Sequence, residues 1–318
     1  MPIPELVWVT HPRHLPAAPR GRAVALDVAF AASGQWKSKT QKLIDALGDR
    51  LALWIDHHEH KEGWAAYLAD PRFVLVPNRV AHACPELVTP ERVAGAGPID
   101  AILAHADFDG AVAAAKWLKG GVEPWPGADE DARAVDSPGR GHTLSERGAR
   151  IAWALDEASA SYKQSRELEL LTRLTRALAA GDMDPALDDE LDTLAKGARV
   201  AEVATRALAQ QKGALVAPGL FLVRVDEKPD NRTRRNLLVY AEEQAPIGAL
   251  LEPDPQGGHW LIAATFDEGL DLADVEGMEG GRSDYRFGRA HGGGEELIAA
   301  LAAYAKARAR PPQGTHTT

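Results

Sequence analysis

Residues 102–118 read ILAHADFDGAVAAAKWL, an apolar run that ends in a polar turn and continues into a helical pattern. The run Ile102–His105 does not alternate between apolar and polar residues, as is typical of a strand buried on both faces of a parallel sheet. Gly110–Leu118 follows directly and has a helical pattern. Strand, turn and helix in this order form the repeating unit of an α/β fold.

The same alternation occupies the residues before this stretch. Thr40–Leu47 predicts a helix, and further short apolar runs predict the strands Leu6–Thr10, Ala23–Phe30, Leu51–Ile55 and Phe73–Val76. We therefore expect a parallel sheet, with the active-site side chains gathered at the carboxyl ends of its strands.

The composition changes at Thr143. Residues 143–146, TLSE, fit a capping box that opens a helical pattern running to Ala180, with a stop at Gly181. Asp184-Pro185 fits an N-cap and first helical position for a further helix reaching about Gln211. We interpret residues 143–215 as a helical connector.

A second, smaller domain follows the connector. Apolar runs predict strands at Leu220–Val225, Leu237–Tyr240, Ile247–Leu251 and Trp260–Thr265. A helical pattern predicts a final helix at Glu295–Arg308. The predicted organisation is a parallel-sheet α/β domain over residues 1–142, the connector, a smaller α/β domain over 216–310 and a disordered tail over 311–318.

Composition limits the function classes. The chain has 318 residues, 45% of them hydrophobic, and a formal net charge of −10. This charge argues against binding long duplex nucleic acid, which needs many cations, but leaves room for a short phosphorylated substrate. Cys84 is the one cysteine, and no signal-peptide pattern or membrane-length apolar run is present. We expect a soluble cytoplasmic protein with no membrane partner.

Three polar clusters follow predicted strands: Asp27, then Asp56-His57-His58, then the turn with His105, Asp107 and Asp109. Alternation in an extended segment would point the last three to one side, and Gly110 would permit a tight turn into the helix. Mixed imidazole and carboxylate ligands suit manganese, zinc or iron. The alternatives are a capping aspartate, a solvated polar turn and an acidic helix N-terminus, respectively.

Together the clusters supply enough ligands for two divalent ions bridged by one carboxylate. Two such ions about 3.5–4 Å apart can activate water and stabilise an in-line displacement at phosphorus. The residues therefore favour phosphoester hydrolysis.

These residues also resemble a known family. Asp27, the DHH sequence at 56–58 and HADFDG at 105–110 look like the motifs of the manganese-dependent DHH phosphoesterases. Residues 15–30 and 79–88 resemble the stretches around the family's second motif and after its DHH. Residues 286–301, RFGRAHGGGEELIAAL, resemble the glycine-rich segment of the DHH-associated domain, which closes over the substrate phosphate.

The motif order is permuted, since in the family the motif similar to HADFDG precedes the isolated aspartate and DHH. A sheet tolerates this order if a later segment supplies the corresponding strand. Otherwise, residues 105–110 are an unrelated acidic turn and the site is incomplete.

The resemblance implies roles for individual residues. The implied metal ligands are Asp27, His57, His105, Asp107, Asp109 and Asp136, with Asp27 or Asp109 as the bridge. His58 would face the phosphate as a cationic or proton-donating catalytic group, with Asp56 beside it in the catalytic set. Asp136 is the best match to a further aspartate that follows a strand in the family, although Asp-Ser-Pro-Gly is also ordinary turn chemistry.

The implied phosphate-binding residues lie in the second domain. Glycines before a helix expose N–H groups to an anion, and guanidinium groups bind phosphate oxygens in pairs. The set is Arg286, Arg289, His291, Gly292, Gly293 and Gly294. Here the histidine precedes the glycines, whereas in the family it follows them. A second basic cluster, Arg232 to Arg235, offers a contact to a nucleotide backbone, but we interpret it as a solvated loop.

The predicted protein is a metal-dependent phosphoesterase with two manganese ions, for which magnesium, cobalt or zinc are substitutes. Its predicted substrates are short oligonucleotides or nucleoside bisphosphates. The alternatives are a cyclic-dinucleotide phosphodiesterase, a pyrophosphatase, and a non-catalytic nucleotide-binding protein with a degenerate site. Because relatives are often dimeric, a homodimer is also expected.

Overall fold

The fold is taken from a computed structural model of the chain. It describes residues 3–32, 34–136, 143–254, 257–265, 270–278, 286–291 and 294–308. The described residues up to Ala198 form one compact unit, and those from Arg199 onward form a second.

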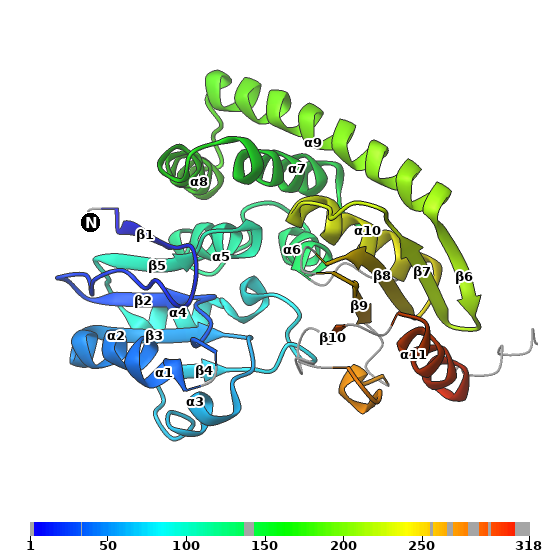
Figure 1. Ribbon diagram of the computed structural model, residues 1–318. Coiled ribbons are helices and arrows are strands. Elements are labelled where there is room, and N and C mark those ends of the chain that lie inside the picture. Colours follow the sequence, from blue (N-terminus) through cyan, green and yellow to red (C-terminus); the bar gives the residue numbers. More distant parts are fainter. Residues whose placement is uncertain are drawn as a thin grey trace, which may run out of the picture. The chain divides into compact units, whose positions relative to one another are not determined.

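The first unit is built on a five-stranded parallel sheet with the strand order β1-β5-β2-β3-β4 (Figure 1). The strands are β1 (Glu5–Val9), β2 (Ala23–Leu26), β3 (Leu51–Asp56), β4 (Phe73–Leu75) and β5 (Ala101–His105). Every neighbouring pair in this sheet is parallel. Although β5 comes last in sequence, it lies between β1 and β2, so its carboxyl end meets the same edge as theirs.

Helices cover both faces of this sheet, which confirms the predicted α/β class. They are α1 (Gln35–Ser38), α2 (Thr40–Leu47), α3 (Lys61–Ala65), α4 (Pro90–Ala96), α5 (Phe108–Leu118) and α6 (Ala128–Asp136), with 3-10 turns η1 (Gly48–Arg50) and η2 (Cys84–Leu87). On one face, Leu103 packs in a cluster with Leu47 of α2. On the other, Ile102 packs with Trp117 of α5. Burial on both sides explains why the strand sequences do not alternate.

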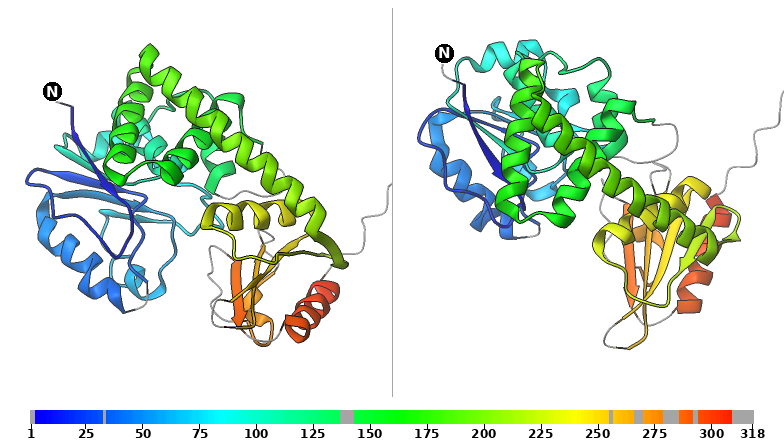
Figure 2. Two further views of the ribbon diagram at one scale, coloured as in Figure 1. Left: turned by 45° about the horizontal axis from the view of Figure 1, so that its top comes forward. Right: turned by 90° about the horizontal axis from the view of Figure 1, so that it is seen from above.

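The region predicted as a connector is divided between the two units. Helices α7 (Glu146–Ser161) and α8 (Gln164–Ala180) and the first part of α9 (Pro185–Lys212) share a buried cluster with α5 and α6. The unit boundary falls within α9, the long helix leading from one unit to the other in Figure 2. These helices bury apolar faces against the first unit, so residues up to Ala198 belong to it.

The ends of these helices correct two predictions and confirm a third. The N-cap of α7 is Ser145, which accepts from the Gly148 N–H at 3.0 Å, rather than Thr143. The predicted run to Ala180 is two helices, because α7 ends at Ser161 and α8 begins at Gln164. The cap at Asp184 is confirmed by its hydrogen bond from the Leu187 N–H at 2.9 Å.

The second unit is a mixed sheet with the order β10-β9-β8-β7-β6. Its strands are β6 (Gly213–Ala217), β7 (Leu220–Arg224), β8 (Ile247–Pro253), β9 (His259–Thr265) and β10 (Arg286–His291). Helix α10 (Asn231–Gln244) contacts β7, β8 and β9, and α11 (Gly294–Arg308) contacts β6, β7 and β9. A 3-10 turn, η3 (Leu272–Asp274), completes the described elements.

Two predictions for this unit were wrong. Leu237–Tyr240 is part of α10 rather than a strand, because Asp230 caps a helix there through the Thr233 N–H at 2.8 Å and Leu237 and Ala241 are buried on one side of it. The basic cluster at residues 232–235 therefore lies on the first turn and a half of α10, not in a loop. Strands β6 and β10 were not predicted.

Candidate functional site

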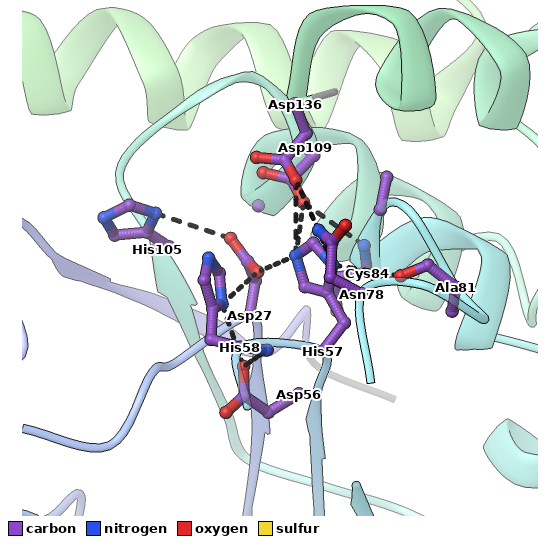
Figure 3. A network of polar contacts seen from close by, with 12 residues as sticks. Asp27, Asp56, His57, His58, Asn78, Ala81, Cys84, His105, Asp109 and Asp136 are labelled. Atoms are coloured by element: carbon purple, nitrogen blue, oxygen red, sulfur yellow. Dashed lines mark hydrogen bonds and ion pairs between the residues drawn. The ribbon is translucent and has the colours of Figure 1, made fainter. Parts of the chain in front are cut away.

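The polar clusters predicted from the sequence meet at the carboxyl edge of the parallel sheet (Figure 3). Asp27 follows β2, Asp56 ends β3 with two histidines after it, and His105 ends β5. Because all five strands run in the same direction, their carboxyl ends reach one edge. The permuted motif is thus brought beside the other two by the position of β5 in the sheet.

Asp27 lies at the centre of the cluster. Its side chain is buried, with Oδ1 3.2 Å from His57 Nε2 and Oδ2 3.4 Å from His105 Nδ1. Neither carboxylate oxygen has a hydrogen bond within standard geometry to another described residue. The backbone φ of Asp27 is 61°, the one positive value at a non-glycine residue in the described ranges. Such a conformation costs about 1–3 kcal/mol and is concentrated at functional sites.

His57 is oriented as a ligand. Its Nδ1 lies 3.1 Å from the carbonyl oxygen of Ala81, so the neutral ring donates there and presents the lone pair of Nε2 to the cluster. Nε2 lies 3.6 Å from Asp109 Oδ2 and 3.7 Å from Asp136 Oδ2. It is also a buried atom without a hydrogen-bond partner among the described residues. The hydrogen bond from Nδ1 to the Ala81 carbonyl oxygen leaves Nε2 for a metal ion, and proteins commonly orient metal-binding histidines in this way.

The three predicted ligands in the turn after β5 do not lie together: His105 and Asp107 contact each other, whereas Asp109 lies on α5. His105 Nδ1 lies 2.5 Å from Asp107 Oδ2, and Asp107 caps α5 by accepting from the Gly110 N–H at 3.1 Å. Asp109 lies in the first turn of α5 and accepts from the Cys84 N–H at 3.2 Å. The expectation that all three point to one side of an extended segment is wrong, because the helix already begins at Phe108.

The resulting geometry contains three overlapping groups whose ligand atoms lie within 4.8 Å of one another. The groups are Asp27–His57–His58, Asp27–His105–Asp107 and His57–Asp109–Asp136. Asp27 and His57 each belong to two of them. The two buried oxygens of Asp27 and Nε2 of His57 have no hydrogen-bond partner among the described residues. They are suited to bind divalent ions through mixed nitrogen and oxygen ligands.

Asp136 reaches the site from a helix. The resemblance to the DHH family implies an aspartate that follows a strand at this position, but Asp136 is the last residue of α6. Asn78, which the sequence reading missed, donates to Asp136 Oδ2 at 3.5 Å and lies 3.3 Å from His57 Nδ1. No sequence pattern marks Asn78, because its role depends on where the loop after β4 lies.

His58 differs from His57 in its partners and exposure. Asp56 Oδ1 accepts from the His58 backbone N–H at 3.1 Å and lies 3.0 Å from its Nδ1, which fixes the ring. Burial by itself would lower the pKa of His58, but the carboxylates of Asp27 and Asp56 outweigh it and raise that pKa to about 10. The side chain keeps 26% exposure, so a protonated His58 can meet a ligand from solvent.

Charge is concentrated in this cluster. Burial, followed by the charge of Asp27, raises the pKa of Asp109 well above its ordinary value. Burial likewise raises the pKa of Asp136 to about 6 despite the neighbouring histidines. For Asp27 burial acts in the same direction, but the imidazoles of His58, His105 and His57 prevail and lower its pKa. So many buried carboxylates in one place favour bound cations.

The predicted phosphate-binding residues belong to the second unit. Arg286, Arg289 and His291 lie on β10, and their side chains are outside the described structure. Gly292 and Gly293 lie outside the described residues, and Gly294 is the first residue of α11. Their role remains a prediction from the sequence.

The chain was compared with known proteins. No family model matches it, and no curated protein matches it significantly in sequence. A solved structure, "pGpG-specific phosphodiesterase - PggH from Vibrio cholrae", is similar with a TM-score of 0.50 at 12% identity, covering 80% of this chain and 79% of that chain. The two proteins share a fold. A fold shared with a phosphodiesterase agrees with the fold implied by the resemblance to DHH phosphoesterases.

None of the helices in the described residues is long and apolar enough to span a membrane.

Proposed function

We propose that this protein is a metal-dependent phosphodiesterase of the DHH type that hydrolyses short oligonucleotides, the shortest of them linear dinucleotides. The observation that carries the proposal is the position of Asp27. Its Oδ1 faces His57 and His58, which follow β3, and its Oδ2 faces His105 at the end of β5. Neither oxygen has a hydrogen-bond partner among the described residues. A buried carboxylate in this position is suited to bridge two ions.

The proposed ligands divide into two sets around that bridge. His105 and Asp107 would hold one ion, and His57, Asp109 and Asp136 would hold the other. A mixture of imidazole and carboxylate ligands suits manganese, zinc or iron better than calcium or magnesium, and the resemblance to the DHH phosphoesterases favours manganese among them. Ions bound there would supply Lewis-acid stabilisation of charge on the phosphate and activation of water.

The remaining polar side chains of the cluster would act on the substrate. A protonated His58, held by Asp56, is placed to donate to a phosphate oxygen or to the leaving oxygen. Asp56 touches His58 rather than forming part of a ligand group, so its proposed role is to position that ring. The family resemblance predicts Asp56 as a catalytic residue, and we propose this positioning role in its place.

The size of the substrate follows from charge and from the structural comparison. A protein with a net charge of −10 lacks the excess cations with which a long nucleic acid is bound. The similar solved structure is that of a pGpG-specific phosphodiesterase, and pGpG is a linear dinucleotide. Both observations support a short substrate over a polymer.

The test is a hydrolysis panel with purified full-length protein, with and without Mn²⁺. The substrates are a 5′-phosphorylated dinucleotide, an unphosphorylated dinucleotide, a nucleoside bisphosphate, a cyclic dinucleotide and pyrophosphate. We expect Mn²⁺-dependent cleavage of the linear dinucleotides, loss of at least ~10³-fold in His57→Ala, and normal rates in Asp45→Asn, an exposed acidic residue on α2. Cleavage of none of the substrates, or equal cleavage by His57→Ala, would refute the proposal.

A further inference from the structure

The turn that follows β1, residues 10–14 (THPRH), lies at the same sheet edge as the metal cluster. β1 pairs with β5 in parallel, with Val9 opposite His105, and the Ala106 N–H donates to the carbonyl oxygen of Val9 at 3.0 Å. His11 is two residues beyond Val9, as Asp107 is two beyond His105. The turn therefore begins beside the group formed by Asp27, His105 and Asp107.

Hydrogen bonds within the turn hold its basic side chains together. The His14 N–H donates to the His11 carbonyl oxygen at 2.9 Å, and the Arg13 N–H donates to His11 Nδ1 at 3.0 Å. The rings of His11 and His14 lie 5.6 Å apart. Because Nδ1 of His11 accepts, its neutral ring carries the proton on Nε2, which is a donor. The side chains of His11, Arg13 and His14 are all exposed.

The side chain of Arg13 has no acidic partner among the described residues, unlike that of Arg79, another arginine near the site. Arg79, which follows β4 at the opposite side of the site, lies 3.4 Å from Glu59. Within the described ranges, the guanidinium group of Arg13 forms no ion pair and no hydrogen bond, although acidic residues outnumber basic ones by 46 to 36. The guanidinium fork of Arg13, in the turn after β1 at the sheet edge that carries the candidate metal ligands, is available to bind an anionic group of the substrate.

We propose that His11, Arg13 and His14 of this turn bind a terminal phosphomonoester of the substrate, at a distance from the phosphodiester that is hydrolysed. This inference rests on the proposed function. A terminal phosphate carries close to two negative charges and three acceptor oxygens, whereas an internal diester carries one charge. One arginine and two imidazoles within four residues match the terminal group better. The turn thus selects oligonucleotides with a phosphorylated end, cleaved at the phosphodiester nearest to that end.

The experiment measures kcat/KM for one dinucleotide in three forms: 5′-phosphorylated, 3′-phosphorylated and unphosphorylated. We expect wild-type protein to prefer one phosphorylated form, which also identifies the end that the turn binds. In Arg13→Ala the ratio of phosphorylated to unphosphorylated kcat/KM should fall about 10- to 100-fold, the range for a charged hydrogen-bonded contact. Arg13→Lys should lose only part of the preference, since lysine keeps the charge without the fork.

Arg20→Ala is the matched control. Arg20 is an exposed arginine that precedes β2, at the amino edge of the sheet and therefore opposite the site. Its removal changes the net charge as Arg13→Ala does, and the preference should stay at the wild-type value. A general electrostatic effect would lower the preference equally in both variants and would overturn the proposal.

A binding measurement separates this inference from the proposed function. Calorimetric titration of full-length protein and Mn²⁺ with a methylphosphonate-linked dinucleotide, with and without the terminal phosphate, measures the preference as a ratio of Kd values, without turnover. Absence of hydrolysis with all substrates would refute the proposed function alone. Absence of a preference for a terminal phosphate in wild type, or an unchanged preference in Arg13→Ala, would overturn the role of the turn.

Discussion

Replacing Asp27 with asparagine is expected to remove most of the thermal stabilisation that Mn²⁺ gives the protein. The substitution keeps the shape of the side chain, and asparagine tolerates the left-handed backbone at this position, where φ is 61°. It removes the charge and leaves one oxygen in place of two. Because Oδ1 and Oδ2 face His57 and His105 respectively, both proposed ion positions lose affinity at once.

The size of the effect follows from ligand linkage. At a free Mn²⁺ concentration of about 100 times Kd, binding stabilises the native state by about 2.7 kcal/mol. For a unit of 150–250 residues, each kcal/mol raises Tm by about 2–4 °C, so the wild-type shift is about 5–10 °C. A 100-fold weaker Kd in Asp27→Asn leaves about 0.4 kcal/mol at the same concentration, which is a shift of about 1–2 °C.

The assay is differential scanning fluorimetry of the full chain across a Mn²⁺ series, with an EDTA-treated sample as the starting point. Asp45→Asn serves as the control for loss of one carboxylate, since Asp45 is exposed on α2, and it should keep the full shift. If Asp27→Asn also kept the full shift, Asp27 could not be the shared ligand. A wild-type protein without any shift would exclude a Mn²⁺ site at this cluster.

Two further predictions concern catalysis and the geometry of the turn after β5. His58→Ala should lower kcat about 10²- to 10⁴-fold in the hydrolysis assay while keeping the Mn²⁺-dependent shift in Tm, because a donor to the substrate is lost and the ligands remain; loss of that shift would assign His58 to the metal instead. Gly110→Ala should lower Tm by about 2–12 °C, because its Cβ would lie 2.3 Å from the carbonyl oxygen of His105. Gly95→Ala on α4 has no atom within 4 Å of the new Cβ and should be neutral or slightly stabilising, and equal losses in both would count against this packing argument.

Much of the first unit could be predicted because its strands are buried on both faces. Each of the five predicted strands has a counterpart in the sheet, since a short, continuous apolar run between two helical patterns is typical of a buried parallel strand. The run LLVY at residues 237–240 was wrongly predicted as a strand for a related reason. Four apolar residues fit a strand and a turn of helix equally well, and the cap at Asp230 and the burial of α10 against the second sheet decide the outcome.

Backbone groups that complete the site left no trace in the sequence. The carbonyl oxygen of Ala81 faces Nδ1 of His57, and the N–H of Cys84 donates to Asp109. Any residue other than proline could supply an N–H, and every residue supplies a carbonyl oxygen, so side-chain identity does not reveal such contacts. They depend on the path of the segment between β4 and α4.

The sequence by itself determined the alternation of strands and helices and the polar residues that follow the strands. It left open whether HADFDG, which comes after DHH in the chain, belongs to the same site as Asp27. The tertiary structure decided this by placing β5 between β1 and β2, parallel to both. Strand order in a sheet is set by how all the apolar faces pack together, which no single segment encodes, and parallel neighbours bring their carboxyl ends to one edge whatever their order in the chain.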